Sequence, residues 1–138
     1  MARDKFHDLV RAGLEAEGWN VTNDPYRLKL APVRFEIDLA AEKIIAATKD
    51  NLKIAVEIKS FLNASLNADF YSALGQFLSY RLVIEELDPE RKLYLALPED
   101  IYNDDFFQSR FLDLAITKYQ LSLLVYNSQT GGLSQWIN

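Results

Sequence analysis

The sequence feature that most constrains the fold is a group of three apolar segments, rich in β-branched residues, in the first half of the chain. They are Val33–Ala40, Ile44–Thr48 and Leu52–Ile58. The residues Lys49–Asn51, between the last two segments, have the composition of a tight hairpin turn. Neighbouring segments as apolar as these are typical of central strands that are covered on both faces. The stretch therefore predicts three adjacent strands in the middle of a buried sheet.

Charged residues interrupt two of these strands. Successive side chains point to opposite faces of a strand, so Glu57 and Lys59 share one face while Ile58 points to the other. A charge on a covered strand costs on the order of several kcal/mol unless it is paired or bound to a metal. Asp38 lies near the end of the first segment, with Glu36 on its side of the strand. An Asp, a hairpin and a Glu-x-Lys together could hold one metal ion and one positioned water.

A second interpretation of the same charges is purely structural, with Lys59 in a buried ion pair with Glu57 or Asp38. Other chemistries find less support. The chain has no cysteine and a single histidine, and it lacks a Gly-rich phosphate loop, a GxSxG motif and a paired-histidine zinc motif. Mg²⁺, or Mn²⁺ in its place, prefers one or two carboxylates together with waters and substrate phosphate. Asp38 and Glu57 would suit such an ion.

Length and composition predict a single globular domain over residues 1–138. A chain of 138 residues can bury about two-thirds of its unfolded surface, and 49% apolar with 25% charged residues is an ordinary composition for a soluble protein. The N-terminus is charged from its third residue and lacks the apolar core of a signal peptide. No apolar run approaches the ~20 residues of a membrane span. We therefore expect a cytoplasmic protein without a membrane partner.

The charge of the chain is unevenly distributed. The net charge of −5 argues against a simple nucleic-acid coat protein, which would normally be basic. Residues 1–59 hold ten Lys or Arg and ten Asp or Glu, whereas residues 60–138 hold five and ten. DNA would therefore have to meet the first half, where Arg27, Lys29 and Arg34 could contact phosphates. The alternative is that these three are solvated surface charges.

The rest of the chain alternates between helical and strand patterns. In order we predict a helix at Arg3–Glu17, a strand at Trp19–Thr22, a basic connector at Tyr26–Pro32, a helix at Leu66–Leu87, a strand at Lys92–Leu97, a helix at Asp104–Lys118 and strands at Leu121–Tyr126 and Leu133–Ile137. Asn63 or Ser65 can cap the long helix. In the last helix, the residues expected to face the core are Phe107, Phe111, Leu114 and Ala115. Together with the three central strands, this order predicts an α/β fold, a three-layer α/β/α sandwich around a central mixed β-sheet.

The last twenty residues contain no charged side chain. An uncharged terminal hairpin over residues 119–138 could pair at a sheet edge with a second subunit and give a homodimer, because unprotected edges promote association. It could equally pack on its own core. The sequence leaves both arrangements open.

The spacing of Asp38 and Glu57, with eighteen residues between them, resembles the D…(E)xK core of restriction-endonuclease-like nucleases, the PD-(D/E)xK superfamily. In that superfamily an Asp and a Glu hold Mg²⁺ and a Lys helps the attacking water. The resemblance therefore implies a restriction-endonuclease-like domain in which Asp38 and Glu57 bind the metal and Lys59 assists catalysis.

Two other parts of the sequence resemble features of this superfamily. In many relatives a first-helix Glu points into the site, and His7 occupies about that place here. Gln76-x-x-x-Tyr80 resembles a motif of RecB-like nucleases that helps to position the site or its DNA. Ordinary alternatives exist for both, namely a helix histidine with a local hydrogen bond and routine packing of Gln76 and Tyr80.

Longer strings are similar to one family. AEKIIAAT and KIAVEIKSF, together with MARDKFHDLVRAGLEAEGW at the start, resemble the XisH-type excision-controlling factors of cyanobacteria, named for the excision of a DNA element that interrupts the fdxN operon. The resemblance implies DNA, an XisI-type companion protein and a site-specific recombinase as partners. Two functions remain open: a metal-dependent DNA nuclease, or a regulatory protein that binds DNA or a companion and controls a recombinase without cutting.

Overall fold

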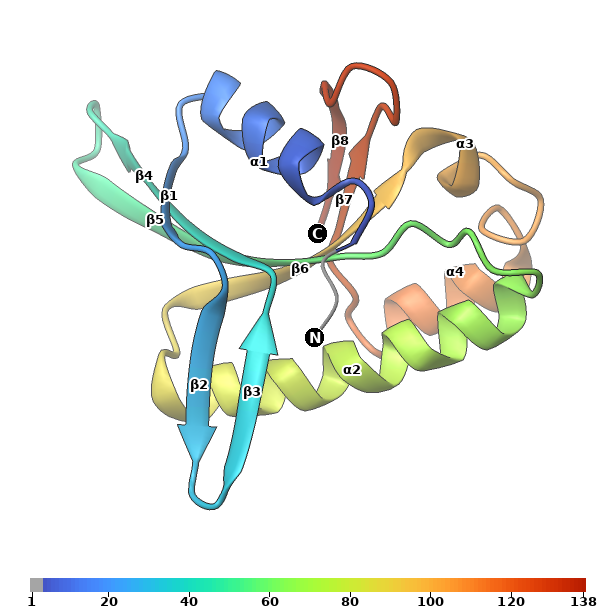
Figure 1. Ribbon diagram of the computed structural model, residues 1–138, viewed down its shortest axis with the longest axis horizontal. Helices are drawn as coiled ribbons and strands as arrows, with labels where there is room; N and C mark the ends of the chain where they lie inside the picture. Colours follow the sequence, from blue (N-terminus) through green and yellow to red (C-terminus); the bar gives the residue numbers. More distant parts are fainter. Residues whose placement is uncertain (1–3) are drawn as a thin grey trace.

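The computed structural model of the chain describes residues 4–138, which form eight strands and four helices (Figure 1). In chain order they are α1 (His7–Ala16), β1 (Asn20–Asn23), β2 (Tyr26–Leu30), β3 (Val33–Ile37), β4 (Leu39–Ile45), β5 (Asp50–Ile58), α2 (Leu66–Leu87), β6 (Arg91–Pro98), α3 (Glu99–Tyr102), α4 (Arg110–Lys118), β7 (Leu123–Tyr126) and β8 (Leu133–Ile137). The predicted start of the first helix at Arg3 lies outside the described residues, but the prediction was wrong for Asp4–Phe6, because α1 begins only at His7.

Six strands form one central sheet in the order β1-β4-β5-β6-β7-β8. The pairs β5–β6 and β6–β7 are parallel and the other pairs are antiparallel, so the sheet is mixed as predicted. Helix α1 packs on one face, and α2 and α4 pack on the other, which gives the predicted three-layer α/β/α sandwich (Figure 1). Among the described residues, no helix is long and apolar enough to cross a membrane.

Strand β5 shows how the sequence builds two cores. Ile54, Val56 and Ile58 belong to the apolar cluster on the α1 side of the sheet, whereas Ala55 belongs to the cluster on the α2 side. This is the alternation predicted for a strand covered on both faces. Glu57 follows the parity of Ala55, so its carboxylate lies in the α2 layer.

Helix α2 has the predicted boundaries. Ser65 is its N-cap, and the Ser65 hydroxyl oxygen accepts a hydrogen bond from the backbone N–H of Ala68 at 3.2 Å. This bond satisfies one of the free N–H groups in the first helical turn. The buried side of the helix includes Phe70, Phe77 and Tyr80, which fixes the helix on the layer that contains Glu57.

The segment Tyr26–Pro32, predicted as a connector, is instead strand β2 and a tight turn. Strands β2 and β3 pair in antiparallel register as a separate two-stranded sheet, which projects from the main sheet alongside α2 (Figure 1). Pro32 suggested an irregular segment because proline cannot donate a hydrogen bond within a sheet. Here Pro32 lies in the turn after Leu30, where no strand hydrogen bond is lost.

The segment Val33–Ala40, predicted as one strand, is broken at Asp38. Ile37 packs in the α2-side cluster and Leu39 in the α1-side cluster, although two such residues on one regular strand would face the same way. The segment Ile44–Thr48 also differs from prediction, because β4 ends at Ile45 and residues 46–49 form the turn into β5. The break places Asp38 between two sheets.

The last predicted helix is shorter than expected. It begins at Arg110, where the Ser109 hydroxyl oxygen accepts from the N–H of Leu112 at 3.3 Å. Phe107 and Ala115 are buried as predicted, whereas Phe111 and Leu114 are exposed and Leu112 is buried instead. Residues 104–108, predicted as the start of this helix, form bends and turns. Strand β8 forms one edge of the main sheet.

Candidate functional site

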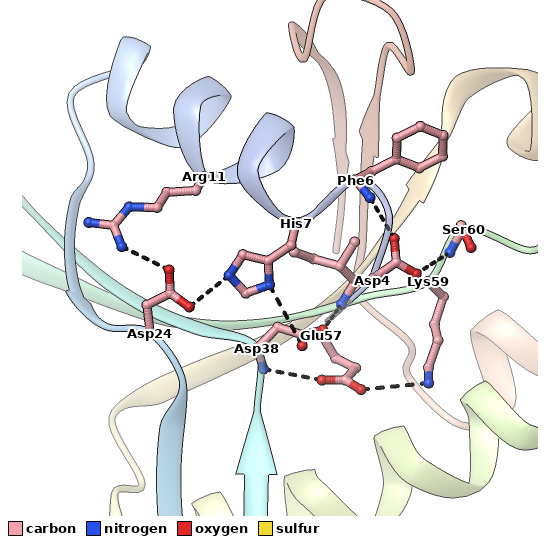
Figure 2. Close-up of polar contacts among 10 residues, drawn as sticks. Asp4, Phe6, His7, Arg11, Asp24, Asp38, Glu57, Lys59 and Ser60 are labelled. Atoms are coloured by element: carbon pink, nitrogen blue, oxygen red, sulfur yellow. Dashed lines mark hydrogen bonds and ion pairs between the residues drawn. The ribbon is translucent and has the colours of Figure 1, made fainter. Parts of the chain in front are cut away.

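Asp38 and Glu57 meet where the hairpin leaves the main sheet (Figure 2). The backbone N–H of Asp38 donates to Glu57 Oε1 at 3.2 Å, and the N–H of Ile58 donates to Asp38 Oδ2 at 2.8 Å. Each carboxylate thus accepts a hydrogen bond from the backbone N–H of the other residue or of the residue next to it. The Asp38 side chain is 16% exposed, and Glu57 is 3% exposed. The prediction that these two residues converge agrees with this geometry.

Lys59 is the cation of the group. Its Nζ lies 3.7 Å from Glu57 Oε2, and its side chain is 28% exposed, so the ammonium reaches the solvent edge of the junction (Figure 2). Lys59 also lines a polar hollow of about 200 Å³ that includes Asp4, Asn63 and Asp69. A larger hollow of about 640 Å³ lies between α2 and the start of β6. We place the candidate site at the junction itself, because Lys59 lines the smaller hollow whereas Asp38 and Glu57 do not.

Two acids share this junction with one nearby ammonium. The pKa of Glu57 is raised to about 8, mainly by burial. The neighbouring charge of Asp38 also raises this pKa, and its effect is larger than the lowering by the Lys59 ammonium. Burial also raises the pKa of Asp38, against the hydrogen bond from the Ile58 N–H. Near neutral pH the pair therefore holds a proton, and a cation that took its place would relieve the repulsion between the carboxylates.

His7 approaches the pair from α1. Its Nε2 lies 2.7 Å from Asp24 Oδ1, while its Nδ1 lies 3.9 Å from Asp38 Oδ1 (Figure 2). Because the Asp24 carboxylate accepts at Nε2, that nitrogen carries a proton, and Nδ1 is the nitrogen that faces Asp38. Nδ1 is buried and has no hydrogen-bond partner in the described chain. A buried polar atom of this kind is normally satisfied, so it indicates a missing polar group beside Asp38.

The arrangement fits a divalent cation in part. Asp38 and Glu57 are close enough to interact, and one or two carboxylates are the usual protein share of an Mg²⁺ site. Within residues 4–138, however, no group of three or more His, Cys, Asp or Glu side chains is close enough together to hold a metal ion. Any ion at this junction would therefore depend mainly on Asp38 and Glu57, with water or phosphate as its other ligands.

The remaining predicted site residues lie around this centre. Tyr80 is buried on α2, and burial together with the charges of Glu57 and Asp38 raises its pKa to about 12. Gln76, one helical turn earlier, has a buried Oε1 without a hydrogen-bond partner in the described chain. Glu36, expected beside Asp38, instead pairs with Arg27 across the hairpin, with 3.5 Å between Glu36 Oε2 and Arg27 Nε.

Three residues that the sequence did not indicate support the site. Asp24 holds His7 and is itself held by Arg11, whose NH1 lies 2.8 Å from Asp24 Oδ2. Asp4 accepts from the Ser60 N–H at 3.0 Å and thereby fixes the backbone just after Lys59 (Figure 2). The spacing of His7 and Arg11 by one helical turn is the only local signal. Their shared partner Asp24 is 13 and 17 residues away in the chain.

The predicted DNA-contacting residues do not lie in the junction. Arg27, Lys29 and Arg34 all lie on the β2–β3 hairpin, whose base is next to Asp38. They line a hollow of about 420 Å³ on the hairpin. The basic residues and the acidic pair are therefore adjoining parts of one region.

Comparisons with known proteins agree with this architecture. The model of the XisH protein family matches residues 1–133. A crystal structure of an XisH family protein from Nostoc punctiforme is 40% identical, with a TM-score of 0.88, over 98% of this chain and 100% of that one. A crystal structure described as an fdxN element excision controlling factor protein from Anabaena variabilis is 39% identical, with a TM-score of 0.88, over 99% and 100%. No curated protein sequence matches the chain.

Proposed function

The chain belongs to the XisH family, and we propose that it acts in DNA-element excision through a divalent-metal-dependent, phosphodiester-cleaving site formed by Asp38, Glu57 and Lys59. The observation that carries the proposal is the buried acidic pair. Glu57 is 3% exposed, and its pKa is raised to about 8 beside a second buried carboxylate. Such an arrangement is costly for the fold alone and is typical of functional sites.

Each residue has a distinct part in this proposal. Asp38 and Glu57 would hold Mg²⁺ or Mn²⁺, which when bound would polarise a DNA phosphate and lower the pKa of a water molecule. Lys59, at the solvent edge, would bind the same phosphate and stabilise charge that develops on it. His7, whose Nδ1 lies 3.9 Å from Asp38 Oδ1, would hold a water beside Asp38. Tyr80 and Gln76 would support the group from α2.

Metal binding and protonation compete at Glu57. A metal ligand must be deprotonated, and Glu57 has a pKa of about 8 in the folded protein. We therefore expect the affinity for Mn²⁺ to rise between about pH 6 and pH 8 and to level off above that, because the proton no longer competes. Calorimetric titration of the protein with Mn²⁺ at several pH values measures this dependence.

The proposal is tested by three carboxamide variants that differ only in place. Glu57→Gln and Asp38→Asn each remove one charge of the junction, whereas Glu36→Gln removes a charge on the hairpin that pairs with Arg27. We expect Mn²⁺ binding to be lost in the first two variants and kept in Glu36→Gln. Cleavage of supercoiled and linear DNA should follow the same order. If wild type and Glu57→Gln bind Mn²⁺ equally, or not at all, the metal site is wrong.

A second candidate function is a non-catalytic regulator that binds DNA or an XisI-type companion protein and controls a site-specific recombinase. The absence of a three-ligand group among residues 4–138 favours this candidate. It predicts that Asp38, Glu57 and Lys59 form only a structural ion-pair group. Cleavage assays with and without the companion separate the two functions, because ion binding without cleavage in either assay leaves only the regulator.

A further inference from the structure

The β2–β3 hairpin has two chemically different faces. Tyr26, Leu28, Phe35 and Ile37 pack in or against the core on the α2 side, and the ring centroids of Phe35 and Tyr80 are 6.4 Å apart. The alternate residues form the outer face: Arg27, Lys29, Arg34 and Glu36. This outer face carries three positive charges and one negative charge, although the whole chain has a net charge of −5. The charge of the protein is therefore locally reversed on the hairpin.

The register of the hairpin places like charges directly opposite each other. Arg27 pairs with Glu36, which is a favourable cross-strand pair, but Lys29 pairs with Arg34. Directly opposed like charges destabilise an antiparallel pair. A short exposed hairpin gains nothing in the isolated protein from this arrangement. The pair becomes favourable when an anion lies between or across the two side chains.

We propose that the outer face of the β2–β3 hairpin binds the phosphate backbone of duplex DNA and guides it to the junction at Asp38. This inference rests on the proposed function, because it names the element that would hold the DNA. Lys29 and Arg34 make the main phosphate contacts. Arg27, held by Glu36 at 3.5 Å, contributes less.

The chemistry of the face favours duplex backbone over single-stranded nucleic acid. Proteins that bind single strands stack the bases on aromatic side chains, and the four outer residues include no aromatic side chain. The two aromatic residues of the hairpin, Tyr26 and Phe35, both pack inward, Phe35 against Tyr80. Lys and Arg without a stacking surface contact phosphates, and such contacts position DNA without selecting its sequence.

The hairpin also sets a distance from the junction. Arg34 lies four residues before Asp38, and a strand advances about 3.3 Å per residue, so the Lys29–Arg34 pair lies roughly 13 Å from the junction. Phosphates of one strand are spaced about 3.4 Å apart along the axis of the duplex. If the duplex axis follows the hairpin, the pair contacts a phosphate about four nucleotides from the one at the junction.

A single charge reversal tests the proposal without harming the fold. Lys29→Glu replaces the repulsive pair with a favourable Glu–Arg pair, so its melting temperature should equal or exceed that of wild type. Its affinity for a fluorescently labelled 20-base-pair duplex of arbitrary sequence should nevertheless fall at least about tenfold, because phosphate contacts dominate such binding. The slope of log affinity against log salt should also become shallower by about 1–2, since each lost contact contributes about 0.9.

Arg110→Glu is the matched control. Arg110 is exposed at the start of α4, away from the hairpin, and its reversal changes the net charge by the same amount. An acidic residue in a first helical turn is well tolerated. We expect Arg110→Glu to keep most of the affinity and nearly the whole salt slope. Equal losses in the two variants would show that only net charge matters, and would overturn the proposal.

Binding is measured in EDTA, so that the result does not depend on metal or cleavage. A failure of the metal site then leaves the hairpin result unaffected, and a failure of the hairpin leaves Mn²⁺ binding unaffected. Absence of duplex binding by wild type, or tighter binding of a single-stranded oligonucleotide, would overturn the proposal. A complementary probe is ethylation of single phosphates in the duplex, which should interfere with binding of wild type but less with that of Lys29→Glu.

Discussion

Two groups of buried charges lie on the same sheet, and they are satisfied very differently. Arg91, at the start of β6, is 8% exposed, and Glu57, near the end of β5, is 3% exposed. Arg91 is opposite Lys53 in the β5–β6 register, four positions before Glu57. The two groups thus have the same sheet and similar burial, and they differ in their partners.

Partners of opposite polarity surround Arg91. Its Nε lies 2.7 Å from Asp88 Oδ2, its NH1 donates to the carbonyl of Ile54 at 3.0 Å, and its guanidinium lies 4.9 Å from the ring centre of Tyr26. Tyr26 also donates to Asp88 at 2.8 Å. Although burial opposes it, the hydrogen bonds from Arg91 and Tyr26 lower the pKa of Asp88. This group binds α2, β2 and the main sheet together.

The Asp38–Glu57 junction has the opposite balance. Two carboxylates face each other, burial raises both pKa values, and the ammonium of Lys59 lies 3.7 Å away, beyond hydrogen-bond distance. Nearby, His7 Nδ1 and Gln76 Oε1 are buried without partners in the described chain. The hydroxyl of Tyr126, on β7 of the same sheet, is also buried without a partner in the described chain. The two charged groups thus differ in how completely their buried polar atoms are paired.

The largest expected effect comes from removing the satisfied charge. We expect Arg91→Met to lower the free energy of unfolding by about 3–5 kcal/mol, because Asp88, Glu42 and the Ile54 carbonyl lose their common donor. Urea denaturation at pH 7 measures this loss. Arg91→Lys keeps the positive charge but lacks the several donors of the guanidinium. Its free energy of unfolding should therefore lie between those of wild type and Arg91→Met. A loss below about 1 kcal/mol would remove the proposed contrast with the junction.

Removing the charge of Glu57 should instead raise the free energy of unfolding. The pKa of Glu57 is about 8 in the folded protein and about 4.5 when unfolded, so the wild type loses stability as pH rises from about 4.5 to 8. Glu57→Gln does not titrate. Relative to wild type it should therefore become more stable across this window, by roughly 2–4 kcal/mol at pH 9. Urea denaturation from pH 5 to 9 tests this difference.

Asp88→Asn provides the control for that pH dependence. The pKa of Asp88 is lowered, so its contribution to stability is present above its unfolded pKa of about 3.8 and is lost as pH falls through the lower folded value. Asp88→Asn should thus be less stable than wild type at pH 7, with the difference shrinking in acid. If both variants show the same pH trend, the two groups do not differ in the way described.

The smallest expected effect sharpens the account of the satisfied group. Tyr26→Phe removes only the hydroxyl that donates to Asp88 at 2.8 Å, while the ring beneath Arg91 remains. We expect a loss of about 1 kcal/mol in the free energy of unfolding, the usual value of one hydrogen bond. Because Arg91 still holds Asp88, the effect should be well below that of Arg91→Met. An effect as large as that of Arg91→Met would mean that the Tyr26 hydroxyl organises the group.

Sequence patterns predicted the features that depend on near neighbours. The alternation along β5 predicted the faces of Ile58 and Glu57, and the Ser65 cap with the apolar periodicity predicted both ends of α2. The pairing of Glu57 with Lys59 is also local, because residues two apart on a strand share a face. Each of these features is decided by side chains within a few positions of each other.

The same patterns failed where the chain changes sheets. Val33–Ala40 has the composition of one strand, and nothing in its composition marks the break at Asp38, since β3 and β4 on either side are both apolar. Strand β2 of the hairpin was not predicted, for a related reason. Leu28 gains its core contacts in the cluster that includes α2, which lies far along the chain, so the pattern of Tyr26–Pro32 looked like an irregular connector.

By itself, therefore, the sequence determined the strand and helix periodicities, the two-sided cover of the central strands and the Asp38, Glu57 and Lys59 combination. Tertiary structure alone decided that His7 faces Asp38, that Asp24 holds His7, and that Arg91 rather than Lys59 is the fully paired buried cation. The physical reason is the separation along the chain over which each kind of interaction acts. Propensity and alternation act between neighbours, whereas the contact of His7 with Asp24 and that of Arg91 with the Ala41 carbonyl join residues 17 and 50 positions apart, and only the path of the chain brings them together.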